Sequence, residues 1–118
     1  MNKELKMVAE FHKKFKAPIA DTPSLIPKDR SDLRYSMTKE EVEEYKLGVE
    51  EKDLENIAKE LTDILYATYG TILEHGLQDK MEGIFNEVHK SNMSKDYSTH
   101  KMIKGENYIK PNLKKFFS

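Results

Sequence analysis

The chain has 118 residues, a length that corresponds to one domain with one hydrophobic core. Its 20 basic and 21 acidic residues give a formal net charge of -1, which indicates neither nucleic acid nor an anionic membrane as a partner. It has no cysteine, which excludes disulfides and thiolate metal sites, and charges interrupt the N-terminal MNKELKMVAEFHKKF too often for a signal peptide or a membrane span. We therefore expect a soluble, cytoplasmic protein.

Apolar residues recur at helical spacing along most of the chain, and this predicts an all-α fold. A first helix is expected over 2–16, followed by a long loop, because the segment APIADTPSLIP holds three prolines that cannot lie in a helix interior. Three more helices are predicted, at about 31–50, 53–75 and 78–94. The chain should therefore be one domain, 1–118, in which a four-helix bundle over 1–95 carries an extended tail over 96–118.

Two of the predicted helices carry acidic residues at a spacing of three. Helical geometry places Glu41 and Glu44 beside the apolar residues of the second helix, whereas Glu43 points the opposite way. On the third helix, Glu60 and Asp63 border an expected core arc made of Leu54, Ile57, Leu61, Ile64, Thr68 and Ile72. Buried carboxylates must be neutralised, paired or bound to a metal. A set of hard oxygens favours Mg²⁺ or Mn²⁺ over zinc, and Mg²⁺ commonly shares its coordination with substrate phosphates.

Two structural explanations compete with a metal site. Thr38 and Glu41 form a T-x-x-E pattern, which is also the capping box of a helix start. Glu60 and Asp63 can instead be surface charges that pair with Lys59 or Lys52, as most helical acids do. The spacing alone leaves both explanations open.

The pattern EEVEE, followed after fifteen residues by ELTD, resembles the E-x-x-E and E-x-x-D signature of the all-α, MazG-like nucleoside triphosphate pyrophosphohydrolases. The segments AEFHKKFKAP, LTDILYATYGTILEHGL, FNEVHKSNMSK and IKGENY extend this resemblance to the phosphoribosyl-ATP pyrophosphohydrolase-like branch over nearly the whole chain. The resemblance implies a Mg²⁺-dependent hydrolase that converts a nucleoside triphosphate to its monophosphate and pyrophosphate. It also implies a set of metal ligands and one accessory carboxylate near the attacking water: Glu41, Glu44, Glu60 and Asp63 as ligands, and Glu40 beside the water.

Substrate contacts are expected from the end of the fourth helix and from the tail. Asn92 and Lys95 continue the apolar line of the fourth helix with polar side chains, which could contact base and phosphate or could instead cap the helix and complement its dipole. In the tail, Lys104 and Tyr108 are candidate contacts. Glu106 stands where related sequences commonly have proline, and we expect it to face solvent.

The predicted function is therefore a Mg²⁺-dependent nucleoside triphosphate pyrophosphohydrolase, with Mn²⁺ as a substitute, in which Glu40 or Glu41 orients the water. A house-cleaning or dUTPase-like role is one form of it. A phosphoribosyl-nucleotide pyrophosphohydrolase and a non-catalytic helical interaction module are the alternatives. Aromatic residues on several helix faces also predict a homodimer or homotetramer. Two histidines near apolar faces, His12 and His89, are expected in a core or a subunit interface rather than in catalysis.

Overall fold

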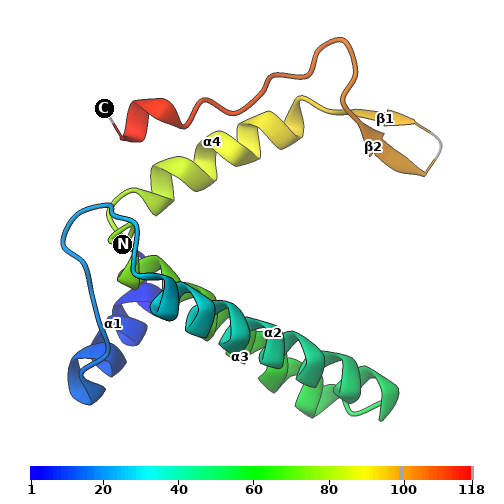
Figure 1. The fold of residues 1–118 in the computed structure, drawn as a ribbon. Coiled ribbons are helices and arrows are strands. Elements are labelled where there is room, and N and C mark those ends of the chain that lie inside the picture. The colour runs from blue at the N-terminus through cyan, green and yellow to red at the C-terminus, as the bar shows by residue number, and fades with distance from the viewer. Residues whose placement is uncertain (99, 118) are drawn as a thin grey trace. The chain divides into compact units, whose positions relative to one another are not determined.

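A computed structural model describes residues 1–98 and 100–117 of the chain. Its main elements are four helices: α1 (Lys3–Phe15), α2 (Lys28–Glu50), α3 (Leu54–Glu74) and α4 (Met81–Met93) (Figure 1). The predicted all-α class is confirmed. Two short strands, β1 (Asp96–Ser98) and β2 (Lys101–Ile103), and a 3₁₀ helix, η1 (Lys114–Phe116), follow α4. In the described part of the chain, none of the helices is long and apolar enough to cross a lipid bilayer.

The chain forms two compact units, and the first comprises Asn2–Gln78. In this unit α2 and α3 lie side by side along most of their length, and α1 packs against α3 (Figure 1). The buried core consists of α1 residues and one α3 residue, and three further apolar side chains pack on it: Leu5, Val8, Ala9 and Leu73, with Ile19, Tyr69 and Ile72 around them. Phe11 stacks edge-on against Tyr66, with ring centroids 5.4 Å apart.

Local sequence determines where these helices begin. The Asn2 side chain accepts a hydrogen bond from the Leu5 amide at 2.7 Å, and Asp53 accepts one from the Asn56 amide at 3.0 Å, so polar caps start α1 and α3. Helix α2 begins at Lys28, directly after Pro27 and three residues before the predicted start. Thr38 is therefore in a helix interior, where its hydroxyl donates to the Arg34 carbonyl at 2.9 Å, and the capping-box alternative is wrong.

The proline-rich segment between α1 and α2 is ordered by hydrogen bonds to the rest of its unit. The Ala20 amide donates to the Leu73 carbonyl, and the Ser24 amide donates to the His75 carbonyl, both at 2.9 Å. The Nδ1 atom of buried His12 lies 3.0 Å from the Pro18 carbonyl, as expected for a histidine held in a core. The three prolines prevent a helix, and these contacts fix the loop instead.

The packed face of α3 agrees only in part with the predicted core arc. Ile72 packs on the core and Ile57 contacts Gly48 of α2, but Leu54 is 78% exposed and Leu61 is 47% exposed, and the face toward α2 also carries Glu60, Ala67 and Gly70. Small and polar side chains let the two helix backbones approach closely, and the bulkier leucines are left on another face of α3.

The second unit contains the chain from Asp79 onward, described here by itself. The predicted extended tail is partly structured, because β1 and β2 form an antiparallel hairpin and η1 follows it. The Glu87 carboxylate on α4 accepts the Asn112 amide at 3.2 Å and the Lys115 ammonium at 3.0 Å, which fastens the tail along α4. His89 on α4 is exposed, so it does not lie in a core, and its place in a subunit interface stays a prediction. The division into a bundle over 1–95 and a tail stays a prediction.

Candidate metal centre

Helices α2 and α3 run antiparallel, and the α2 residues that contact α3 recur every seven positions. We call each such group of contacting residues a layer. Near the start of α2, Arg34 contacts Ala67 and Gly70 near the end of α3. Near the end of α2, Gly48 approaches Ile57 so closely that a Cβ at Gly48 would lie 3.3 Å from its Cγ1. The middle layer brings acidic residues of both helices together.

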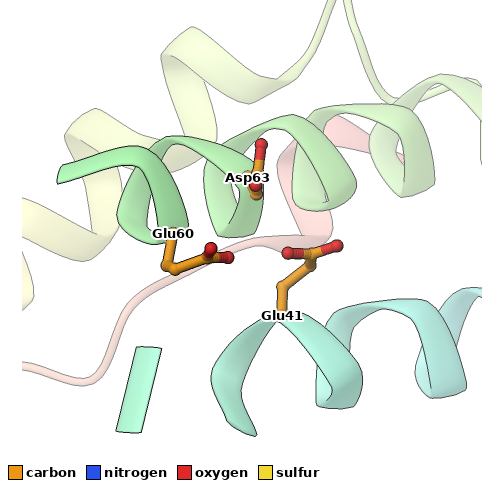
Figure 2. A group of neighbouring side chains, drawn as sticks. All are labelled: Glu41, Glu60 and Asp63. Atoms are coloured by element: carbon orange, nitrogen blue, oxygen red, sulfur yellow. The ribbon is translucent and has the colours of Figure 1, made fainter. Parts of the chain in front are cut away.

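This middle layer consists of Glu41 from α2 with Glu60 and Asp63 from α3. One carboxylate oxygen of each residue lies within 4.8 Å of those of the other two. Figure 2 shows Glu41 reaching from α2 toward α3 and Glu60 reaching back from α3. Glu60 is only 5% exposed, whereas Glu41 and Asp63 are half-buried. We call these three residues the carboxylate cluster.

The carboxylate cluster has more negative than positive charge around it. Partial burial raises the pKa of Glu41, and repulsion from Asp63 and Glu60 raises it further. The Lys59 ammonium opposes this effect, since it lies 2.8 Å from Asp63 Oδ2 and 3.6 Å from Glu60 Oε1. Its hydrogen bond to Asp63 raises the pKa of Lys59 in turn. One exposed ammonium thus balances part of the charge of three carboxylates.

The donor set of the cluster fits a hard divalent cation. All three side chains offer carboxylate oxygens, and no imidazole or thiolate is among them. The Glu60 side chain is only 6% exposed and lies 3.6 Å from the Lys59 ammonium, so a bound divalent cation would add to the positive charge that this lysine supplies. The arrangement can hold Mg²⁺ or Mn²⁺ and leave further positions for water and phosphate oxygens.

Two of the sequence-predicted acids stand outside the carboxylate cluster. Glu44 was predicted to face inward with Glu41, but it is exposed, because the line of contact along α2 follows residues seven apart and passes to one side of Glu44. Glu40 is exposed as well, and its charge contributes to the raised pKa of Glu41. Both lie next to the cluster on α2, so their roles stay predictions.

The predicted substrate residues gather at the end of α4 and in the tail. The Lys104 ammonium lies 5.2 Å from the centroid of the Tyr108 ring. A hydrogen bond to buried Ser91 lowers the pKa of Tyr108, and the positive charges of Lys104 and Lys95 lower it further. Three of the four predicted residues thus lie in one basic neighbourhood. The fourth, Asn92, is exposed in the last turn of α4, and the capping position after that turn is taken by Ser94. Glu106 is exposed, in agreement with the expectation that it faces solvent.

Sequence reasoning missed Arg34, which is buried at the same helix interface as the cluster. Its guanidinium donates to the Ala67 carbonyl at 2.8 Å and to the Thr71 hydroxyl at 3.0 Å, and it lies 3.3 Å from a Glu74 oxygen. Burial lowers the pKa of Arg34, and the Glu74 charge opposes that shift. The available signal was the spacing of Arg34, Glu41 and Gly48, which are seven residues apart and therefore share one face of α2.

Comparison with known protein families gives one finding. The profile of the family described as phosphoribosyl-ATP pyrophosphohydrolase matches residues 8–92. The match includes every member of the carboxylate cluster and Asn92, and it ends before the tail. No curated protein matches the chain at a significant level.

Proposed function

The chain belongs to the phosphoribosyl-ATP pyrophosphohydrolase family, and from this premise we propose that it is a Mg²⁺-dependent hydrolase that converts a nucleoside triphosphate to a monophosphate and pyrophosphate. Family membership already makes the chain a pyrophosphohydrolase, a hydrolase of phosphoanhydride bonds. The metal, the substrate and the residue roles are our proposal.

The observation that carries the proposal is the carboxylate cluster. Three carboxylates from two helices, one of them the buried Glu60, lie within 4.8 Å of one another, with one exposed lysine as counter-charge. An arrangement of this kind is costly in a protein that uses it only for packing. It is suited to a reaction in which a triphosphate and its cation must be held together.

In this proposal Glu41, Glu60 and Asp63 would hold Mg²⁺, with Mn²⁺ as a substitute, and Glu44, which is exposed beside them on α2, would be a further ligand. When bound, the cation would polarise the phosphoanhydride and lower the pKa of the attacking water. Glu40 or Glu41 orients this water and accepts its proton. The water oxygen forms a new bond to phosphorus while the bond from that phosphorus to the bridging oxygen breaks, and pyrophosphate and the monophosphate separate.

The substrate contacts in the proposal come from Asn92, Lys95, Lys104 and Tyr108. Lysine ammonium groups act as point charges on phosphate oxygens, and the carboxamide of Asn92 offers both a donor and an acceptor to a base. The basic neighbourhood around Tyr108 supports this assignment, because Lys104 lies over the Tyr108 ring and the charges of Lys104 and Lys95 both lower the pKa of the phenol.

A phosphoribosyl nucleotide is the second candidate substrate, and the description of the matching family favours it. Its triphosphate chemistry is the same, and only the groups attached to the base differ. A house-cleaning or dUTPase-like activity would use the first reaction on damaged or unwanted triphosphates.

The test is a substrate panel assayed with Mg²⁺. Standard nucleoside triphosphates, dUTP, damaged triphosphates and phosphoribosyl-ATP are each incubated with the protein, and pyrophosphate is measured against orthophosphate. We expect pyrophosphate as the product, loss of activity with EDTA, and loss of activity in Glu60→Gln. The control is Glu43→Gln, an exposed change on the same helix as Glu41 that should retain activity. Orthophosphate release, or equal activity of Glu60→Gln and the parent, would contradict the proposal.

We also propose that the protein assembles from copies of itself as a homodimer or homotetramer. The leucines left on the outer face of α3 support this, since Leu54, Leu61 and Leu65 recur at helical spacing and are 78%, 47% and 55% exposed. Light scattering at micromolar concentration tests it. A monomer, or no change in mass for the double variant Leu61→Glu with Leu65→Glu, would contradict it.

A further inference from the structure

Arg34 makes a set of contacts that only one placement of α2 against α3 can satisfy. Its Nε donates to the Thr71 hydroxyl at 3.0 Å, one Nη donates to the Ala67 carbonyl at 2.8 Å, and the other lies 3.3 Å from Glu74 Oε2. The guanidinium is a planar fork, so these partners fix both its position and its orientation. Arg34 itself is 6% exposed, so water cannot replace a partner that moves away.

Gly70 makes room for this guanidinium. A Cβ at Gly70 would lie 2.0 Å from an Nη atom of Arg34, closer than any two such atoms can approach. The Arg34 fork thus fits over a position on α3 where a side chain is missing. A shift of α2 by one residue would move the fork by about 1.5 Å and turn it by about 100°, onto positions that carry side chains.

The Glu74 carboxylate is paired with two arginines, Arg30 and Arg34. Arg30 donates two hydrogen bonds to its carboxylate, from Nε at 3.0 Å and from Nη at 2.8 Å, while Arg34 approaches from within the interface. The Glu74 side chain is 1% exposed. A buried ion pair of this kind contributes little net stability relative to apolar packing, because desolvation offsets the attraction. The ion pair therefore matters mainly because its geometry allows only one placement of α2 against α3.

The carboxylate cluster lies on the same two helix faces. Glu41 follows Arg34 by seven residues on α2, and Asp63 precedes Gly70 by seven on α3, so both layers share one register. Seven residues span about 10.5 Å of helix and return to nearly the same direction. The register that seats Arg34 over Gly70 is thus the register that brings Glu41 to Glu60 and Asp63.

We propose that Arg34, seated over Gly70 and held by Glu74, is a positioning residue of the metal centre that fixes the distance between the α2 and α3 carboxylates. The inference rests on the proposed function, because it takes the carboxylate cluster as a metal site. Arg34 touches neither metal nor substrate in this role. It acts through the placement of Glu41.

The test compares metal affinity with stability in matched variants. Arg34→Lys keeps the positive charge but loses the planar guanidinium. Gly70→Ala keeps Arg34 but places a methyl group where the guanidinium packs. Leu73→Ala is the control, since Leu73 is 1% exposed in the core between α1 and α3 and should lower the melting temperature without touching the register. Each folded protein is titrated with Mg²⁺ and with Mn²⁺ by calorimetry. We expect at least tenfold weaker binding in Arg34→Lys and Gly70→Ala, and parental affinity in Leu73→Ala.

A double variant separates positioning from folding. Arg34→Met combined with Glu74→Leu removes the buried charges together, so it should recover the melting temperature that Arg34→Met alone loses. It should not recover metal affinity. Because the natural chain has no cysteine, spin labels at Glu43→Cys and Thr62→Cys, both exposed, report the register directly, and their distance distribution should broaden or shift with Arg34→Lys.

The outcomes distinguish the inference from the proposed function. If the parent binds neither Mg²⁺ nor Mn²⁺, the proposed function fails and the inference fails with it. If the parent binds metal and Arg34→Lys binds it within twofold of the parent, with an unchanged label distance, the inference alone is overturned. Recovery of metal affinity in the double variant would overturn it too.

Discussion

Replacing Glu41 by glutamine should stabilise the metal-free protein while it abolishes metal binding. Two unit charges separated by 4.8 Å repel by about 0.9 kcal/mol at the dielectric constant of water and by about 3.5 kcal/mol at an effective value of 20. Glu41 is half-buried and faces two carboxylates, but Lys59 offsets part of the repulsion. We expect a net gain of about 1 to 2 kcal/mol for Glu41→Gln at neutral pH, because glutamine keeps the shape and removes the charge.

The assay is thermal unfolding with EDTA and with saturating Mg²⁺. For a chain of this length, the gain corresponds to a rise of about 3 to 8 °C in the melting temperature of the EDTA-treated protein. Mg²⁺ at one hundred times its dissociation constant should stabilise the parent by about 2.7 kcal/mol and leave Glu41→Gln unchanged. The control Glu43→Gln should match the parent in both conditions. A lower melting temperature of Glu41→Gln in EDTA, or equal stabilisation of both proteins by Mg²⁺, would refute the reasoning.

The same reasoning predicts a pH dependence with a definite sign. Burial and the neighbouring carboxylates raise the pKa of Glu41 in the folded state, so the folded protein binds this proton more tightly than the unfolded chain does. The associated stability is fully present below the unfolded pKa and is lost as the pH rises through the folded pKa. Glu41→Gln should remove this component from the pH dependence of unfolding in EDTA.

Three further predictions concern charges around the two candidate regions. Lys59→Gln removes the ammonium that contacts the cluster and should tighten Mg²⁺ binding several-fold by calorimetry, whereas Lys28→Gln, which breaks a similar i,i+4 pair with Asp32, should not. The hydrogen bond from Lys115 lowers the pKa of Glu87, so attachment of the tail should be complete above the unfolded pKa of this carboxyl and lost as the pH falls through its folded pKa. Hydrogen exchange of the tail amides measures this detachment and should become faster as the tail is released. Glu87→Gln should give the same faster exchange at neutral pH. Lys95→Ala should raise KM for nucleotide with unchanged Mg²⁺ affinity, and parental kinetics would make Lys95 only a helix-terminal charge.

The helices were predictable because each has a strong local signal. Apolar spacing located all four, and the prolines located the loop between the first two, so every predicted helix is present with its ends within three residues. The hairpin after α4 was missed because its sequence, DYSTHKMI, holds no glycine, asparagine or proline to mark a turn. The turn instead places His100 at a φ of 75°, a conformation that a histidine adopts uncommonly.

The candidate site was predictable in its residue types and less so in its geometry. The E-x-x-E and E-x-x-D spacing singled out three acids that the structure brings together and one, Glu44, that it leaves outside, because a spacing of three does not say which of two glutamates lies on the line of helix contact. That line is set by tertiary packing, in which Arg34 and Gly48 occupy the layers on either side of Glu41. Glu44 is three residues from Glu41, a rotation of about 300° that places it about 60° to one side of this line.

The error on α3 has the same physical origin and explains why the site lies where it does. Helix α3 carries one row of leucines and one row of small or polar residues. Hydrophobicity alone favours the leucines as the buried face, yet the face packed on α2 carries Glu60, Ala67 and Gly70. Leucines at this interface would push the helices apart and fill the space around the carboxylates, whereas small residues let the backbones approach and leave that space open for the cation that we propose. In our proposal the row of leucines on α3 contacts a second copy of the chain, so that this helix serves the proposed metal site with one face and the proposed assembly with the other.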